Sequence, residues 1–330
     1  MDIEKTKKFH VKHFHIPCGY MGDFTQEVRK LNAALRVALR NRAFWLENSC
    51  RCDIIKRTIK DGWSAILTVS NRERATPMAK IVALINQKGG VGKTTTAVNL
   101  ACALTEKGKK VLLCDFDPQG NATSGVGLEP HDLDTSIYEL IIADNPEVRS
   151  AILHTKWVDV LGSNVDLAGA EIDLISLSRR EYRLKDVLDQ VREDYDFIII
   201  DCPPSLGILT LNCLCAADSF MVPLQTEYYA LEGLSQLMAT VRSVQRGLNR
   251  QIRIEGILLT MYDGRTNLAV QVVEEVKKHF GDRVYAAVVP RNVRLSEAPS
   301  HGQPITAYDR SCRGAEAYIA VAEEFLEKNQ

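Results

Sequence analysis

The chain has no long apolar run, no excess of charge of either sign and few aromatic residues. None of its uninterrupted hydrophobic stretches approaches the roughly 20 residues of a membrane-spanning helix, and no basic, apolar and small-residue signal opens the chain. Because it carries 41 Lys+Arg against 42 Asp+Glu, it is neither a uniformly basic nucleic-acid coat nor an acidic disordered chain. Its 330 residues, 45% of them hydrophobic, are typical of a globular protein with a sizeable core.

The nine cysteines form no familiar metal or disulfide pattern. An odd number in a chain without a secretion signal indicates a reducing, cytoplasmic environment. The pairs Cys50-x-Cys52 and Cys213-x-Cys215 lack the two-residue gap of a zinc knuckle, so we expect buried thiols that pack as small hydrophobic side chains. A metal site at the histidines of positions 10, 13 and 15 is the less favoured alternative, because no matching ligands lie nearby.

Two parts of the chain differ in charge. Residues 1–77 carry 15 Lys+Arg and 8 Asp+Glu, a net charge of +7, and the remaining 26 and 34 give residues 78–330 a net charge of −8. We predict a basic, poorly structured N-terminal extension over 1–77 and one domain over 78–330. Within the extension, 26–46 has the pattern of a basic helix, and a solvated helix is favoured over one that lies on a membrane surface.

From Lys80 onward, short β-branched runs alternate with longer helical stretches. Strands are predicted at 80–86, 110–117, 158–161, 197–201, 219–224, 254–261 and 284–289, and helices at 94–107, 183–193, 231–245, 268–280 and 314–327. This alternation, with strands that are apolar on both faces, predicts an α/β fold: a mostly parallel twisted sheet with helices on both faces. Ligands in such sheets bind at the carboxyl ends of the strands.

The most informative segment runs from Lys88 to Thr95, K-G-G-V-G-K-T-T, between a predicted strand and a predicted helix. Its glycines let the backbone approach phosphate oxygens, which the amides of the turn and of the helix N-terminus can surround. Lys93 is expected to reach the β- and γ-phosphates, and the Thr94 hydroxyl to bind Mg²⁺. Gln87 stands where the usual loop, G-x-x-x-x-G-K-[ST], has its first glycine. The predicted fold class is that of the P-loop NTPases.

Carboxylates end two further predicted strands. Asp201 follows an apolar run and is expected to hold Mg²⁺, through water; the alternative is a cap for the next helix. Asp115 and Asp117 share one side of their strand, because alternate residues point to opposite faces. One of the two can orient the attacking water while the other stabilises the loop at 118–123, which is placed to respond to the γ-phosphate.

These motifs together resemble a known family. K-G-G-x-G-K-T-T, D-x-D-P-Q-G-N-A-T and D-C-P-P-S-L-G are similar to the motifs of the ParA/Soj partition ATPases, which belong to a wider group that includes MinD and the nitrogenase iron protein. The segments 228–235 and 290–302 place the resemblance among chromosomal Soj-like members. It runs from about Lys80 to the C-terminus.

The resemblance implies an ATPase whose cofactors are ATP and Mg²⁺ and which forms a homodimer with ATP. Lys88 would be the signature lysine, which crosses to the phosphates of the other protomer and stabilises charge there. Asp117 would position the attacking water, so the implied catalytic residues are Lys88, Lys93 and Asp117. Pro290 and Asn292 match positions that border the adenine. The complete set of implied ATP-binding residues is Lys88, Gly89, Gly90, Val91, Gly92, Lys93, Thr94, Thr95, Pro290 and Asn292.

The resemblance also implies partners. Arg265 and Arg294 match surface arginines that bind double-stranded DNA non-specifically in Soj-like proteins. Such a patch can act despite the net charge of −8, because salt screens acids beyond about 8–10 Å and a dimer doubles the phosphate contacts. A ParB-type centromere-binding protein would stimulate hydrolysis, and a replication initiator is a further candidate partner. The expected protein is cytoplasmic, nucleoid-associated and without stable membrane contact, and it serves chromosome segregation and, in addition, replication control.

Two other functions of related proteins fit the sequence less well. A MinD-like membrane-cycling division regulator needs a basic amphipathic C-terminal helix, whereas residues 316–330 present an acidic face. An iron–sulfur electron donor needs cysteines that bridge a cluster across a dimer. Cys213 and Cys215 lie in a predicted helical stretch without the glycine-rich context of such a cluster.

The first 77 residues admit two interpretations. Long plasmid-type relatives carry an N-terminal sequence-specific DNA-binding domain, which the basic charge would suit. We favour the hypothesis that translation starts at Met78, which leaves 253 residues, an ordinary single-domain length. Phe9-His10-Val11-Lys12 can be encoded by the palindrome TTTCACGTGAAA, which resembles the core of a ParB-binding site, so upstream DNA would have been read as protein. Codons that break the palindrome would contradict this part of the hypothesis.

Overall fold

The computed structural model describes residues 78–227 and 230–330. The chain divides into two units, Met1–Arg74 and Ala75–Gln330, and the described residues belong to the second. The predicted helix at 26–46, the histidines at 10, 13 and 15 and the cysteines at 18, 50 and 52 lie outside the described residues. The proposed boundary between an extension and a domain at 77/78 stays a prediction.

The described part of the chain forms a seven-stranded sheet in the order β3-β4-β2-β5-β1-β6-β7. Its strands are β1 (Lys80–Leu84), β2 (Val111–Asp115), β3 (Leu153–His154), β4 (Asp159–Leu161), β5 (Phe197–Asp201), β6 (Ser219–Gln225) and β7 (Arg253–Thr260). Every neighbouring pair is parallel except β3 with β4. The mostly parallel sheet is therefore confirmed.

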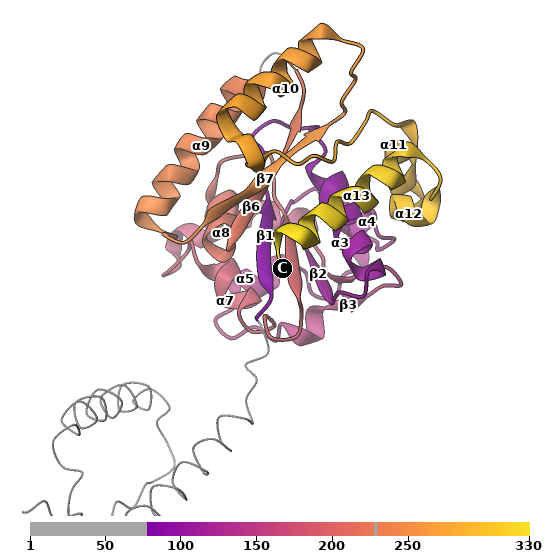
Figure 1. Cartoon of the computed structure of the whole chain (residues 1–330). Coiled ribbons are helices and arrows are strands. Elements are labelled where there is room, and N and C mark those ends of the chain that lie inside the picture. Colours follow the sequence, from indigo (N-terminus) through magenta and orange to yellow (C-terminus); the bar gives the residue numbers. More distant parts are fainter. Residues whose placement is uncertain (1–77, 228–229) are drawn as a thin grey trace, which may run out of the picture. The chain divides into compact units, whose positions relative to one another are not determined.

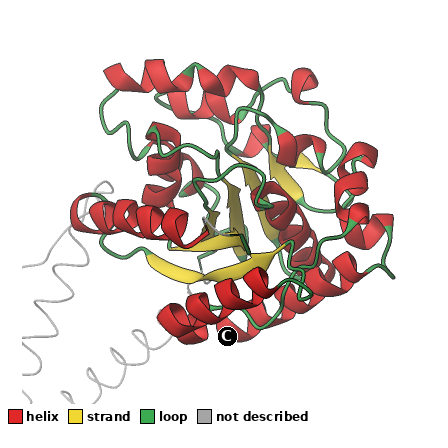
Figure 2. Ribbon diagram, turned by 90° about the horizontal axis from the view of Figure 1, so that it is seen from above, coloured by secondary structure: helices red, strands yellow, loops and turns green. Residues whose placement is uncertain are grey.

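Helices cover both faces of this sheet (Figures 1 and 2). The longer ones are α3 (Lys93–Glu106), α5 (Ile137–Ile142), α7 (Arg183–Leu188), α8 (Ile208–Ala216), α9 (Ala230–Gly247), α10 (Asn267–Phe280) and α13 (Arg313–Lys328). Four short helices complete them: α4 (Asn121–Ser124), α6 (Ala170–Asp173), α11 (Val293–Glu297) and α12 (Ile305–Tyr308). Figure 1 shows α8, α9 and α10 on one side of the sheet and α3 and α13 on the other.

Alternation along the buried strands produces the two layers of the core. In β1, Ile81 and Ala83 pack into the cluster that contains α8 and α9, whereas Val82 and Leu84 pack into the cluster of α3 and α13. Successive side chains of a strand point to opposite faces, so a continuous apolar run is what a strand covered on both sides requires. Because β1 and β2 each pair in parallel with β5, the carboxyl ends of the three strands lie at one edge of the sheet.

Three details of the predicted elements were wrong. Within the segment 284–289 only Val284 forms a bridge to β7, because the N–H groups of Ala286 and Ala287 donate instead to the Glu324 carboxylate of α13, at 3.0 and 2.9 Å. The helix expected at 183–193 ends at Leu188, after which the chain continues in tighter turns. The two-residue edge strand β3 carried no recognisable sequence signal.

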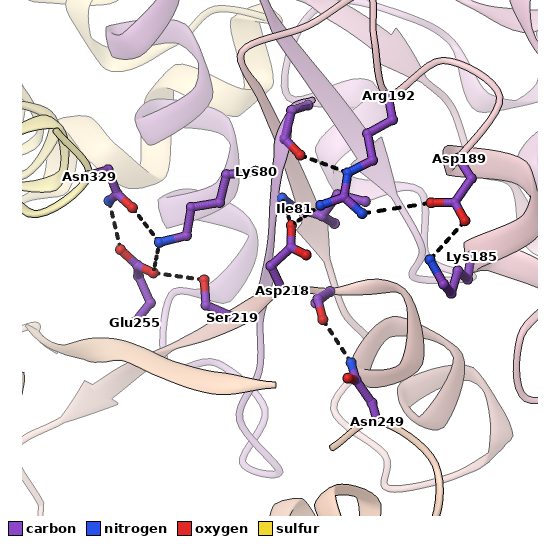
Figure 3. Close-up of polar contacts among 12 residues, drawn as sticks. Lys80, Ile81, Lys185, Asp189, Arg192, Asp218, Ser219, Asn249, Glu255 and Asn329 are labelled. Carbon is purple, nitrogen blue, oxygen red and sulfur yellow. Dashed lines mark hydrogen bonds and ion pairs between the residues drawn. The ribbon is translucent and has the colours of Figure 1, made fainter. Parts of the chain in front are cut away.

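Polar networks fix the amino ends of the strands (Figure 3). The buried Glu255 carboxylate accepts hydrogen bonds from Lys80 at 2.5 Å and from Ser219 and Asn329 at 2.7 Å. Burial acts to raise the pKa of Glu255, but these donors outweigh it and the pKa is lowered. The first strand and the last residues of the chain are thereby held together.

Candidate nucleotide site

The loop between β1 and α3 is shaped to receive an anion. Gly90 and Gly92 have φ of 72° and 88°, in the left-handed region where a side chain is strained. A Cβ built on Gly89 or Gly90 would meet no atom within 4 Å, so the loop has an open face. The N-terminus of α3 has neither a side-chain cap nor an acidic residue in its first turn. Its N–H groups are thus available to phosphate oxygens.

The side chains of Asn86, just after β1, and of Thr260, at the end of β7, hold this loop in place. The Asn86 side-chain amide donates to the Pro223 carbonyl at 2.7 Å, and its oxygen accepts the Lys88 N–H at 3.0 Å. The Thr260 hydroxyl donates to the Val91 carbonyl at 2.8 Å. Sequence reasoning missed Asn86 and Thr260, because Pro223 and Val91, which they contact, are far from them in the sequence and no local motif marks them.

Lys93 and Lys88 have different surroundings. Lys93 is only 6% exposed, and burial lowers the pKa of its ammonium against the opposing influence of Asp201. Among the described residues its Nζ reaches only the Lys88 carbonyl oxygen, at 3.4 Å, so its donors remain available for phosphate. Lys88 is half-exposed, and its Nζ pairs with the Glu227 carboxylate in the loop after β6.

Asp201 lies level with Leu84 of β1 and Asp115 of β2. It is fully buried, and within the described residues neither of its oxygens has a hydrogen-bond partner of good geometry. Burial, and then Asp115, raises the pKa of Asp201, whereas the nearby Thr94 hydroxyl and Lys93 oppose this. A buried carboxylate without a partner, beside a threonine hydroxyl, fits a divalent cation. The residues that were expected to hold Mg²⁺ are therefore together.

Asp115 and Asp117 have separate environments at the end of β2. The Asp115 carboxylate accepts the N–H and the hydroxyl of Thr123, both at 2.8 Å, and the Asp117 N–H at 3.2 Å. Burial raises the pKa of Asp115 to about 6. Asp117 accepts the Gln119 N–H at 3.0 Å on one oxygen. Both carboxylates thus bind the following loop, but Asp115 does so with both oxygens. Asp117 uses one oxygen for the loop, so it is the better candidate for positioning water.

A pocket of about 320 Å³ adjoins the phosphate loop. Gly92 and Thr95 line it from the loop, and Pro290 and Asn292 line it from the segment that follows β7. Met261, also in its lining, has φ of 48°, a strained conformation of a kind that clusters at functional sites. Pro290 and Asn292 thus line the same pocket as Gly92 and Thr95 of the phosphate-loop segment. A larger groove of about 630 Å³ lies at the opposite edge of the sheet and is separate from this site.

The two sequence-predicted arginines lie in adjacent segments. Tyr262 and Pro290 bridge the loop that carries Arg265 to the segment that carries Arg294. Each arginine has an acidic partner: Arg265 binds Asp263 with two bonds of 2.8 and 2.6 Å, and Arg294 lies 2.8 Å from Glu297.

A third arginine was missed. Arg291 is exposed in the same segment as Arg294, and it contributes, after Arg265, to lowering the pKa of Asp263 to about 2. Its position beside the predicted pair depends on the pairing of the two segments, which the sequence alone does not reveal.

The cysteines and the last helix bear on the alternative functions. Cys213 and Cys215 are buried in α8, where a cluster shared between two chains could not reach them. In α13 the apolar side chains Tyr318, Val321 and Phe325 are buried in the core. No helix of residues 78–227 and 230–330 is long and apolar enough to cross a membrane.

A glycine-rich phosphate loop between β1 and α3, with a buried aspartate at the end of the adjacent strand β5, defines a P-loop NTPase. The family model described as "AAA domain" matches residues 79–254. The sporulation initiation inhibitor protein Soj of Bacillus subtilis (strain 168) is 58% identical over 249 residues, 75% of this chain and 98% of that protein. The chromosome partitioning protein ParA of Myxococcus xanthus is 51% identical over 255 residues, 76% and 89% of the two chains.

A solved structure is also similar to this chain, although it bears the name of a different enzyme. Cobyrinic acid a,c-diamide synthase from Mycobacterium smegmatis, with bound ADP and magnesium, is 39% identical with a TM-score of 0.66 and covers 76% of this chain and 95% of its own. The chain belongs to the Soj/ParA family of chromosome-partitioning ATPases.

Proposed function

We propose that this protein is an ATP-dependent partition switch. With ATP it forms a homodimer that binds DNA without regard to sequence, and it hydrolyses ATP when a ParB-type centromere-binding protein stimulates it. Its cofactors are ATP and Mg²⁺, in keeping with the nucleotide and magnesium of the related solved structures. The protein associates with the nucleoid and serves chromosome segregation. It also acts in replication control, where its partner is a replication initiator.

Different residues of one chain bind the phosphates, hold the magnesium ion and position the attacking water. The amides of the glycine loop and the Lys93 ammonium bind the β- and γ-phosphates, and Pro290 and Asn292 border the adenine. Thr94 and, through water, Asp201 hold Mg²⁺, which supplies positive charge against the phosphoryl oxygens. Asp117 orients the attacking water.

The proposal rests on the different surroundings of the two lysines of the phosphate loop, Lys88 and Lys93. Lys93 is buried beside the loop interior and is suited to the chain's own nucleotide. Lys88 is half-exposed and contacts the loop after β6 instead, so its charge is accessible to a second molecule. A cation delivered across an interface stabilises the phosphoryl group only when two chains meet, which links the ATP state to dimerisation.

Dimerisation then links the ATP state to DNA. Arg265 and Arg294, together with Arg291, present guanidinium groups from adjacent segments. Their exposed pairs with Asp263 and Glu297 are worth little, so a DNA phosphate can replace the carboxylate. Two copies of the patch double the phosphate contacts, and affinity rises steeply with their number. Binding is expected to be independent of base sequence and strongly salt-sensitive.

A membrane-cycling regulator is less well supported. Such a protein needs a helix whose apolar face is free to enter the headgroup region. In α13 that face is buried in the core, and Glu323 and Glu324 lie on the same helix.

The deciding experiment is retention of the protein on non-specific DNA with ATP, with ADP and without nucleotide. We expect retention only with ATP, and we expect its loss in the variants Lys93→Ala and Lys88→Ala. Equal retention of the wild-type protein with ATP and with ADP would refute the switch. Pelleting with anionic liposomes in the same buffers would reveal membrane cycling instead.

A further inference from the structure

We propose that Glu227 is a positioning residue that holds Lys88 while the protein is a single chain and releases it when a dimer forms. This inference rests on the proposed function, because it concerns the lysine that acts on the second copy. It adds that dimerisation has to break an ion pair with the loop after β6, which weakens the dimer.

The backbone places the two side chains opposite each other. Lys88 follows β1 and Glu227 follows β6, and these strands pair in parallel. The Asn86 side chain ties them together, because it donates to Pro223 of β6 and accepts the Lys88 N–H. The ion pair therefore joins two segments that are already fixed, and it needs little ordering of the backbone.

The Lys88 side chain is directed away from its own phosphate loop. Its carbonyl oxygen lies 3.4 Å from Nζ of Lys93, whereas its own Nζ contacts the Glu227 carboxylate. We infer that the Lys88 ammonium leaves the Glu227 carboxylate when it moves out to a phosphate of another chain. Engagement of Lys88 across a dimer therefore requires that the pair break.

Glu227 has no other side-chain hydrogen bond to a described residue, and its side chain is 46% exposed. Its backbone carbonyl accepts the Ala230 N–H at 3.0 Å, a contact that glutamine would keep. Replacement by glutamine should therefore leave the fold intact and remove only the charge that holds Lys88.

Because the Lys88–Glu227 pair is half-exposed, its loss can change the affinity of the dimer only moderately. A half-exposed ion pair shifts a population by at most about fivefold. Each dimer breaks two such pairs, so Glu227→Gln should tighten the dimer by up to about 25-fold. The gain should disappear at roughly 1 M salt, where exposed charges are screened, and a purely structural role of Glu227 would not show that dependence.

The test is sedimentation velocity of the full chain with a non-hydrolysable ATP analogue and Mg²⁺, at low and at high salt. We expect Glu227→Gln to dimerise several-fold to 25-fold more tightly than wild type at low salt and equally at high salt. Glu227→Asp should stay within about threefold of wild type, because the flexible lysine stem can follow a shorter carboxylate. Glu275→Gln is the matched control, since Glu275 is another half-exposed glutamate paired with a lysine, Lys278, and it should have no effect.

Each contrary outcome has a definite meaning. An unchanged or weaker dimer in Glu227→Gln would overturn the inference and leave the proposed function standing. Equal tightening in Glu275→Gln would attribute the effect to net charge and also overturn it. A wild-type protein that stays monomeric with the analogue would overturn both the inference and the proposed dimer.

Discussion

Replacing Lys93 by alanine should weaken the binding of ATP to the single chain without unfolding it. The ammonium is 6% exposed, and among the described residues it has one long contact, 3.4 Å to the Lys88 carbonyl oxygen. Folding has already removed most of its water, as the lowered pKa of the buried group indicates. The lysine is therefore held ready for a ligand rather than engaged in a strong internal ion pair.

The magnitude follows from the bonds that the variant cannot make. Hydrogen bonds to charged groups contribute about 1.5–3 kcal/mol, so the loss of the contact to the phosphates corresponds to a dissociation constant raised about 10- to 150-fold. Lys88→Ala should behave differently, because Lys88 pairs with Glu227 and is not directed at its own loop. We expect its affinity for ATP, measured on the monomer, to stay within about threefold of wild type.

The assay is a titration of a fluorescent ATP analogue at protein concentrations too low for dimerisation, with thermal melting as a check on the fold. The two lysine variants are compared under identical conditions. If both lost affinity equally, the assignment of one lysine to each nucleotide would be refuted. If Lys93→Ala bound as wild type, the loop would not be the phosphate site.

Three further outcomes are expected. Asp117→Ala should still bind ATP and be retained on DNA, with hydrolysis slowed about 100-fold or more because no group orients the water; a normal rate in a phosphate-release assay would contradict this. Arg265→Ala should weaken DNA retention for all sequences alike and reduce its salt slope by about 2 per dimer, whereas an unchanged slope would remove Arg265 from the interface. Glu255→Gln should lower the free energy of unfolding by about 1–3 kcal/mol at neutral pH. Because the pKa of Glu255 is lowered in the folded state, its contribution exists above its ordinary value of 4.5 and is lost as the pH falls. The difference in melting temperature between Glu255→Gln and wild type should therefore become smaller in acid. A difference that stays constant with pH would contradict a lowered pKa of Glu255 in the folded state.

Local patterns made the phosphate site predictable. The glycines of the loop, the lysine and threonine that open α3 and the aspartate that ends β5 are each recognisable within a few residues. Strand β5 was predicted at its observed bounds for the same reason, since its apolar run is short and ends in a charged residue. The failed strand at 284–289 shows the limit: its sequence is suited to a strand, but Glu324, 37 residues beyond Ala287, takes the N–H groups that a strand would have used.

By itself the sequence determined most of the strands and the longest helices, the phosphate loop and the carboxylate beside it, because these depend on side-chain periodicity and on neighbours along the chain. Only the tertiary structure decided that Asp115 accepts both hydrogen bonds from Thr123, and that Lys88 meets Glu227, 139 residues away. Such contacts depend on which strands lie side by side and on how their ends align. That alignment results from packing the whole core, and no short segment encodes it.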